Sequence, residues 1–230
     1  MITIRCRVIF LLLLLCSTLC ACQVNGTDSD ATERVSQSAH QILAQVYVPI
    51  ITENDIENPL FSLIYLDEDN IPELVILDRY WGKYSIYTIR DNSAECIVDS
   101  MTTVEMTYYE RKNIISTFWR SNGGGDEGEY ASSYYQLNQF SQTLVDGVTP
   151  SFEFTYHAVY NEKGEWTETG IINYYENGKE IDEAAYNQIF TDFDISHSGD
   201  VSCFSENNKC FTKDELLMYL DTESKAEVTS

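Results

Sequence analysis

The chain is poor in cysteine beyond its N-terminal region, and it lacks the short signatures of many enzymes. After Cys22 the only cysteines are Cys96, Cys203 and Cys210, and none has the C-x-x-C spacing typical of metal and redox sites. The sequence contains no G-x-S-x-G, H-E-x-x-H or phosphate-binding loop, and its 3 histidines are scattered. These absences argue against serine hydrolases, zinc peptidases and nucleotide-binding proteins.

Basic residues are also scarce. The 14 lysines and arginines are outnumbered by 37 aspartates and glutamates, which gives a formal net charge of −23. Nucleic acids and anionic lipid surfaces are polyanions, so we expect no nucleic acid partner and no wide contact with such lipids. The charge is compatible with cation binding, although most acidic residues are expected on the solvated surface.

The N-terminus has the pattern of a bacterial export signal. A short basic region precedes the leucine run 11–15, which is about half the length that spans a bilayer. Residues 19–22, Leu-Cys-Ala-Cys, then resemble a lipobox, in which the cysteine is acylated and becomes the new N-terminus. We therefore expect a signal peptide at 1–21, with Cys22 anchoring the protein to the extracellular face of the cell membrane. The alternative is ordinary cleavage near Ala21, which releases a soluble protein.

The rest of the chain predicts an α+β fold, with a polar tether at 22–31 and a single β-rich ectodomain at 32–221. Apolar residues recur at helical spacing from Val35 until Pro49 closes the segment. Short β-rich runs joined by turns follow between residues 61 and 175, including one from Phe140 to Val145. They predict an antiparallel meander of about eight to ten strands.

Two short helices are expected to complete the ectodomain. Asp182 can cap the first, and Thr212 forms a capping box with Glu215 at the start of the second. Residues 222–230 are expected to be a disordered tail.

Two stretches resemble an uncharacterised lipoprotein family of gut Firmicutes. Residues 63–76, LIYLDEDNIPELVI, resemble that family's strand–DLDGDGIPEL–strand hairpin. Residues 174–187, YYENGKEIDEAAYN, are similar to its NGKEVSEEEYN strand-to-helix corner. Together with the signal and the meander, the resemblance covers most of the mature chain. It implies a lipid-anchored β-rich surface protein and brings no established activity.

The first of these hairpins carries the best chemical candidate. Its loop resembles a D-x-D-x-D-G calcium loop, in which alternate carboxylates surround a hard cation. The ligands by that pattern are Asp67, Asp69, the carbonyl of Ile71, and Glu73. Tyr65 replaces the first acid and Asn70 replaces glycine, and losing an acid lowers the affinity. The alternative is a structural hairpin, and calcium is the only cofactor that the sequence indicates.

A second loop, residues 194–205, imitates an EF-hand but has few charged ligands, and Ser205 takes the place of the bidentate glutamate. A loop closed by a disulfide between Cys203 and Cys210 is the better interpretation outside the cytoplasm. Cys96 is then expected to be a buried strand thiol.

The aromatic content is high, with 16 Tyr, 10 Phe and 3 Trp. Neighbouring residues of a strand face opposite sides of a sheet, so each aromatic doublet is expected to turn one ring outward. The rings concerned are Tyr80-Trp81, Tyr108-Tyr109, Trp119, Tyr134-Tyr135, Trp166 and Tyr174-Tyr175. Outward rings can bind a glycan or a protein partner, and the alternative is cross-strand packing.

From the sequence we expect a membrane-anchored surface lipoprotein with a non-catalytic ectodomain that binds a ligand or partner. The first alternative is a calcium-binding module built on the loop at Asp67. The second is an envelope hydrolase that uses surface carboxylates.

Overall fold

The computed structural model describes residues 39–122, 127–139, 143–160, 166–204, 208 and 210–226. The chain divides at Ser36, and every described residue belongs to the unit Gln37–Ser230. The expected signal peptide, Cys22 and the tether therefore lie outside the described residues. Among the described helices, none is long and apolar enough to cross a membrane.

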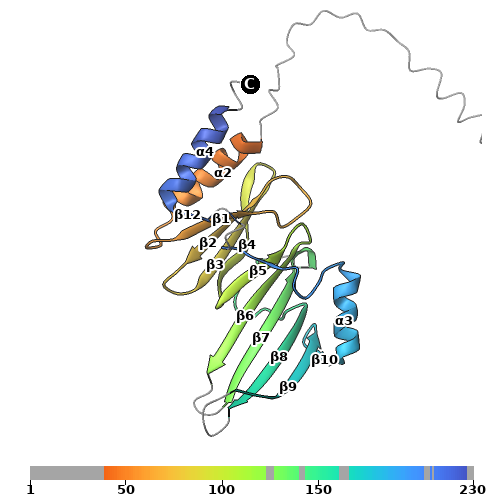
Figure 1. Ribbon diagram of the computed structural model, residues 1–230. Coiled ribbons are helices and arrows are strands. Elements are labelled where there is room, and N and C mark those ends of the chain that lie inside the picture. The colour runs from red at the N-terminus through yellow and green to blue at the C-terminus, as the bar shows by residue number, and fades with distance from the viewer. Residues whose placement is uncertain are drawn as a thin grey trace, which may run out of the picture. The chain divides into compact units, whose positions relative to one another are not determined.

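The second unit combines helices with two antiparallel sheets (Figure 1). In chain order the elements are α2 (Ala39–Glu53), β1 (Leu60–Ile64), β2 (Glu73–Asp78), β3 (Lys83–Arg90), β4 (Ser93–Thr102), β5 (Glu105–Tyr109), β6 (Ile114–Asn122), β7 (Glu127–Gln136), the short 3-10 helix η1 (Leu137–Gln139), β8 (Phe152–Tyr160), β9 (Trp166–Glu176), β10 (Lys179–Ile181), α3 (Glu183–Asp192), β11 (Val201–Ser202), β12 (Cys210–Phe211) and α4 (Lys213–Ala226). The expected class, an antiparallel β-rich α+β fold with one N-terminal and two C-terminal helices, is confirmed.

The meander divides into two sheets, which the sequence did not predict. The first has the order β12-β1-β2-β3-β4, and the second has the order β10-β9-β8-β7-β6-β5-β11. The chain passes between them at two consecutive residues. Thr103 donates its N–H to the carbonyl of Gly82, in the turn before β3 of the first sheet, and Val104 donates its N–H to the carbonyl of Phe118 in the second sheet. Apolar and polar residues alternate in the strands on both sides of this point. The alternation alone therefore does not show where one sheet ends and the other begins.

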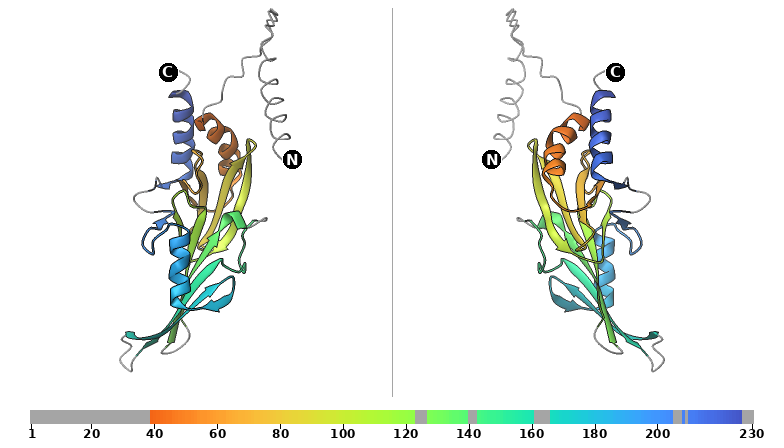
Figure 2. Two further views of the ribbon diagram at one scale, coloured as in Figure 1. Left: turned by 90° about the vertical axis from the view of Figure 1, so that its right-hand side faces the viewer. Right: turned by 90° about the vertical axis from the view of Figure 1, so that its left-hand side faces the viewer.

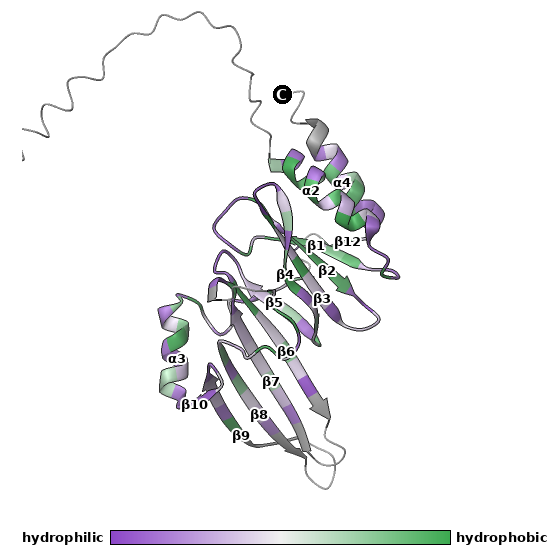
Figure 3. Ribbon diagram, turned by 180° about the vertical axis from the view of Figure 1, so that it is seen from behind, coloured by the Kyte–Doolittle hydropathy of each residue, from purple (hydrophilic) through white to green (hydrophobic). Residues whose placement is uncertain are grey.

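Three apolar clusters hold the unit together. One lies between the two sheets and includes Ile86 and Val98 from the first sheet and Met106 and Ile115 from the second. Another packs α2 and α4 against the opposite face of the first sheet, where the two helices lie beside each other in Figures 1 and 2. The last packs α3 against the second sheet around Phe152. Hydrophobic and hydrophilic residues alternate along α2 and α4, as expected for helices with one packed face (Figure 3).

The two expected helix caps are present. The side chain of Asp182 accepts a hydrogen bond from the N–H of Ala185 at the start of α3. At the start of α4, the Thr212 N–H and hydroxyl both donate to the carboxylate of Glu215.

Two boundaries differ from those expected. The sequence predicts a strand from Phe140 to Val145. Residues 140–142 lie outside the described residues, and Leu144 forms only an isolated parallel bridge with Val98. Helix α4 continues to Ala226, so residues 222–226 are helical rather than a disordered tail, consistent with the good helix formers Glu223, Lys225 and Ala226. Residues 227–230 lie outside the described residues.

Candidate ligand-binding cavity

The loop between β1 and β2 is held by its own carboxylates. The Asp69 N–H donates to Asp67 Oδ1 at 2.9 Å, and the Ile71 N–H donates to Asp69 Oδ1 at 2.7 Å. These are side-chain-to-backbone turns of the kind that aspartate favours. The first residue of β2, Glu73, completes the loop by accepting the Leu66 N–H at its Oε2 at 2.8 Å.

The fold brings the three predicted acidic residues together. Carboxylate oxygens of Asp67, Asp69 and Glu73 all lie within 4.8 Å of one another. Ile71, the other predicted ligand, contributes its N–H to Asp69, and its role as a carbonyl ligand stays a prediction. The convergence is compatible with a hard cation, since such ions are bound by several carboxylate and carbonyl oxygens.

Glu73 is the unusual member of this group, because only 2% of its surface is exposed. Its Oε1 accepts a hydrogen bond from the Thr88 hydroxyl at 3.2 Å, in addition to the Leu66 N–H at Oε2. Burial, together with the nearby Asp67 and Asp69 carboxylates, raises the pKa of Glu73 to about 7, against the lowering effect of the Leu66 hydrogen bond. The pKa of Asp69 is also raised, first by burial.

Arg111 supplies the positive charge nearest to the outer part of the loop. Its guanidinium donates to the carbonyl of Asp69 at 3.1 Å and lies 5.1 Å from the ring centre of Tyr65. Tyr65 replaces the first acid of the calcium-loop pattern, so an arginine–aromatic contact takes the place of a carboxylate. Arg111 therefore helps to fix the loop conformation without any bound ion.

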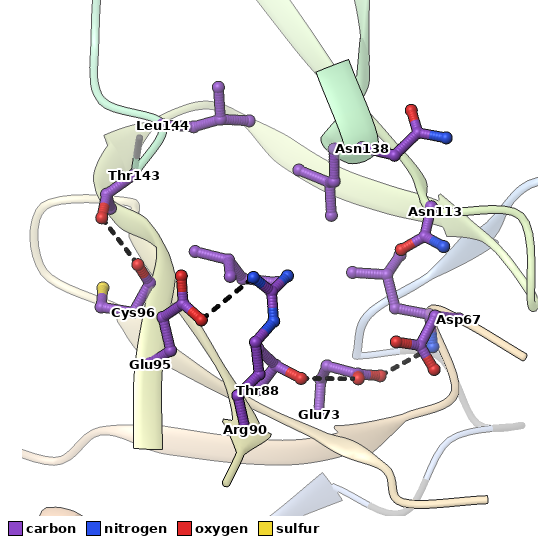
Figure 4. A pocket seen from close by; sticks show the side chains of 13 residues that line it. Asp67, Glu73, Thr88, Arg90, Glu95, Cys96, Asn113, Asn138, Thr143 and Leu144 are labelled. Carbon is purple, nitrogen blue, oxygen red and sulfur yellow. Dashed lines mark hydrogen bonds and ion pairs between the residues drawn. The ribbon is translucent and has the colours of Figure 1, made fainter. Parts of the chain in front are cut away.

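Glu73 also lines a cavity of about 240 Å³, which Figure 4 shows from close by. Leu66 and Leu144 line the cavity and also belong to the apolar cluster between the two sheets, whereas Asp67 and Glu73 make one end of it polar. Its walls come from the first sheet, the β1–β2 loop, the β5–β6 turn, η1 and the segment 143–144: Leu66, Asp67, Glu73, Thr88, Arg90, Glu95, Cys96, Ile97, Asn113, Leu137, Asn138, Thr143 and Leu144. Convergent polar groups on apolar walls are the usual composition of a small-molecule site.

The charged side chains differ in their surroundings within the cavity. Arg90 Nη1 and Glu95 Oε2 form an ion pair at 3.2 Å, and both side chains are largely open to solvent. Glu73 and Thr88 lie deeper and are buried. In Figure 4 the guanidinium of Arg90 turns toward Glu95, and the carboxylate of Glu73 lies between Thr88 and Asp67. The cavity therefore has a charged, solvated rim and a buried acidic end.

A short segment closes the side of the cavity along β4. The Thr143 hydroxyl donates to the carbonyl of Cys96 at 2.7 Å, and the Leu144 N–H donates to the carbonyl of Ile97 at 2.9 Å. These bonds cover part of an edge strand and place an apolar side chain, Leu144, against the polar walls. Cys96 is a half-buried thiol in a strand, and burial raises its pKa to about 11, which makes it a poor nucleophile.

The second acidic loop does not form a comparable site. Asp194 pairs with Lys112 at 2.9 Å, and Asp200 accepts the hydroxyl hydrogen bond of Thr107 at 2.7 Å. Ser205 lies outside the described residues. The structure does not contain the expected disulfide. Cys203 is a free buried thiol in the core between the sheets, and Cys210 is a free exposed thiol on β12.

The prediction of one inward and one outward ring in every aromatic doublet is wrong for three doublets, two of which are buried and one of which, in the β2–β3 turn, is exposed at both rings. Tyr108-Tyr109 and Tyr134-Tyr135 are fully buried, because this part of the second sheet is covered on one face by the first sheet and on the other by α3. Tyr80 and Trp81 are 80% and 64% exposed, and Trp119 is also exposed. Tyr174 and Tyr175 are half-buried, and the side chain of Trp166 lies outside the described residues. Binding of a glycan or protein through the exposed rings stays a prediction.

The sequence pattern predicts the acidic end of the cavity and none of its other walls. Asp67 and Glu73 stand close together in one recognisable loop pattern. The other polar walls, Thr88, Arg90 and Asn138, come from β3 and η1 and carry no pattern of their own. Only the sheet-to-sheet packing brings them together.

Comparison with protein families, with curated proteins and with solved structures gives no match for this chain.

Proposed function

We propose that this protein is a membrane-anchored surface lipoprotein whose ectodomain binds a small polar ligand in the cavity that its first sheet forms with η1 and the β5–β6 turn. The anchor rests on the lipobox at Cys22 and on the polar tether after it. The binding role rests on one observation above all, the buried carboxylate of Glu73 at the inner end of a cavity. Burying a carboxylate is unfavourable unless its surroundings compensate, and such groups in concavities are frequent in functional sites.

Binding without chemical change is favoured by the way the carboxylates are engaged. Glu73 accepts two hydrogen bonds from the chain itself, and Glu95 is paired with Arg90. A glycosidase needs one carboxylic acid and one carboxylate directed at opposite sides of the bond that it cleaves. The envelope hydrolase is for this reason the less favoured alternative.

A ligand panel tests the binding role. The full chain in detergent is melted with neutral monosaccharides, amino sugars, amino acids and diamines at millimolar concentration. We expect at least one class to raise the melting midpoint and to be recovered unchanged. Asn138→Trp, which places a large ring at the exposed wall of the cavity, should abolish this response. The matched control Ala184→Trp, on the exposed face of α3, should retain it.

The outcomes separate the alternatives. A response that survives Asn138→Trp places the ligand elsewhere on the protein and contradicts the cavity assignment. The hydrolase needs a probe with a glycosidic bond, and cleavage of a disaccharide by the same protein would support it instead. No response from any class overturns the binding proposal for ligands of this size.

Calcium binding by the β1–β2 loop is the second candidate function. It is favoured by the convergence of the Asp67, Asp69 and Glu73 oxygens within 4.8 Å, in the loop whose spacing suggested the metal. If it is correct, millimolar calcium raises the melting midpoint of the wild type and leaves Asp67→Asn/Asp69→Asn unchanged. Asn138→Trp should keep the calcium response, which distinguishes this site from the cavity.

The anchor has its own test. Metabolic labelling with a fatty-acid analogue should mark the wild type and leave Cys22→Ala unlabelled. Equal label in both proteins would remove the anchor from Cys22.

A further inference from the structure

The lining of the cavity has more negative than positive charges. Among its lining residues, Asp67, Glu73 and Glu95 carry carboxylates, and Arg90 carries the guanidinium that offsets one of them. That guanidinium forms an ion pair with Glu95 at the rim, where the two side chains are 68% and 48% exposed. The buried end, with Glu73 and Asp67, therefore has no cationic partner among the lining residues.

The nearest other cation does not serve this end. Arg111 donates to the loop carbonyls of Glu68 and Asp69 and is not a lining residue. The charged groups closest to Glu73 are instead Asp67 and Asp69, whose carboxylate oxygens lie within 4.8 Å of its own. The electrostatic potential at Glu73 is therefore negative, like the charge of its own carboxylate.

The carboxylate of Glu73 keeps acceptor capacity toward the cavity. Each of its oxygens accepts one hydrogen bond, from the Leu66 N–H and from the Thr88 hydroxyl. A carboxylate offers about four lone-pair positions, so about two remain for a ligand donor. An ammonium group has three donors and a full positive charge, and it can bind Glu73 and Asp67 together.

The remaining walls suit a small polar ligand. The amide side chains of Asn113 and Asn138 can both donate and accept hydrogen bonds, and Leu137 and Leu144 supply apolar surface. The cavity of about 240 Å³ is much larger than a single water molecule needs, so it has room for a small ligand with several polar groups.

We propose that the ligand of this cavity is a small hydroxylated primary amine, of the size and kind of an amino sugar, whose ammonium group binds between Glu73 and Asp67. This inference rests on the proposed function, because it specifies what the cavity binds. The hydroxyl groups of the ligand lie toward the two asparagines and the Arg90–Glu95 pair.

The test compares two probes that differ in one group, glucosamine and glucose. The full chain in detergent is titrated with each at neutral pH and matched ionic strength, and both the melting midpoint and the amide resonances of Leu66, Asp67 and Thr88 are followed. We expect glucosamine to raise the midpoint and shift these resonances, with glucose at least about tenfold weaker, since a charged hydrogen bond is lost. Glu73→Gln should weaken glucosamine by about tenfold for the same reason.

Two variants at an exposed position keep the test independent of folding. Asn138→Lys puts an ammonium group of the chain at the cavity wall and should weaken glucosamine, and Asn138→Asp should strengthen it. Neither change should alter the unfolding of the protein without ligand.

The failures of the two proposals are distinguishable. If glucose and glucosamine bind equally well and Asn138→Trp abolishes both, the ligand is not recognised through its amine. The cavity then remains a binding site. Glucosamine binding that is indifferent to both Glu73→Gln and the charge at position 138 also overturns the amine assignment. If neither probe binds, the amine assignment is wrong, and the wider panel alone decides whether the cavity binds another class.

Discussion

The β1–β2 loop and the loop that follows α3 both carry carboxylates at spacings that resemble calcium-binding loops. In the first, Asp67, Asp69 and Glu73 converge, and burial, followed by repulsion from the neighbouring carboxylates, raises the pKa values of Asp69 and Glu73. In the second, the carboxylate of Asp194 is fully exposed and paired with Lys112, which lowers its pKa. Spacing in the sequence therefore does not determine whether carboxylates meet. Convergence requires the loop to end in a buried strand, as it does at Glu73.

The largest expected difference between the loops is in stability. Glu73→Ala leaves the buried Leu66 N–H and the Thr88 hydroxyl without their acceptor, and unsatisfied buried donors are costly. We expect the free energy of unfolding to fall by about 2–4 kcal/mol in urea denaturation at mildly acid pH. Asp194→Ala is the matched change in the exposed loop and should leave it unaltered. A loss below the error of the fit for Glu73→Ala would contradict the structural role of its carboxylate.

The pH dependence of stability provides the next contrast. The pKa of Glu73 rises from 4.5 in an unfolded chain to about 7 in the folded one. The folded state then binds the proton more tightly, so this group's contribution to stability is fully present below the unfolded value and is lost as the pH rises through the folded one. Between these two pH values the wild type should lose up to about 3 kcal/mol relative to Glu73→Gln.

The measurement is urea denaturation of both proteins across that range, in the presence of a chelator. Subtracting the two curves removes the contributions of all other titrating groups that the substitution leaves unchanged. Parallel curves would show that Glu73 titrates as it does in the unfolded chain. Asp194→Asn serves as the control, because an exposed carboxylate with a lowered pKa should give no loss over the same window.

How far the sequence predicts these features depends on how local they are. The caps at Asp182 and Thr212 and the convergence of Asp67 with Glu73 depend on residues close together in the chain, and all of these are observed. The cavity depends on packing between two sheets, and the alternation of residues is the same whether strands form one sheet or two. The tyrosine doublets show the same limit: alternation correctly places neighbouring rings on opposite faces, but it does not show that both faces are covered.

Two consecutive basic residues in the β5–β6 turn each contact one of the two loops. Arg111 donates to the carbonyls of Glu68 and Asp69 and lies against Tyr65, whereas Lys112 pairs with Asp194. Arg111→Met keeps an apolar stem and removes the charge, so the first loop loses its fixed cation. We expect it to cost about 1 kcal/mol by urea denaturation, the usual size of a cation–aromatic contact combined with partly solvated hydrogen bonds. No loss at all would mean that the loop is fixed by its aspartates alone.

Lys112→Met is the matched change for the second loop, and we expect no measurable change in the denaturation midpoint. The side chain of Asp194 is 94% exposed, and an ion pair in water gains little over the separately hydrated charges. The only clear consequence should be a rise in the pKa of Asp194, which carbon-detected NMR titration can follow, because Lys112 is the cause of its lowering. If Lys112→Met instead destabilises the protein as much as Arg111→Met, the second loop is more than a solvated turn. The contrast between a convergent and a dispersed acidic loop then no longer holds.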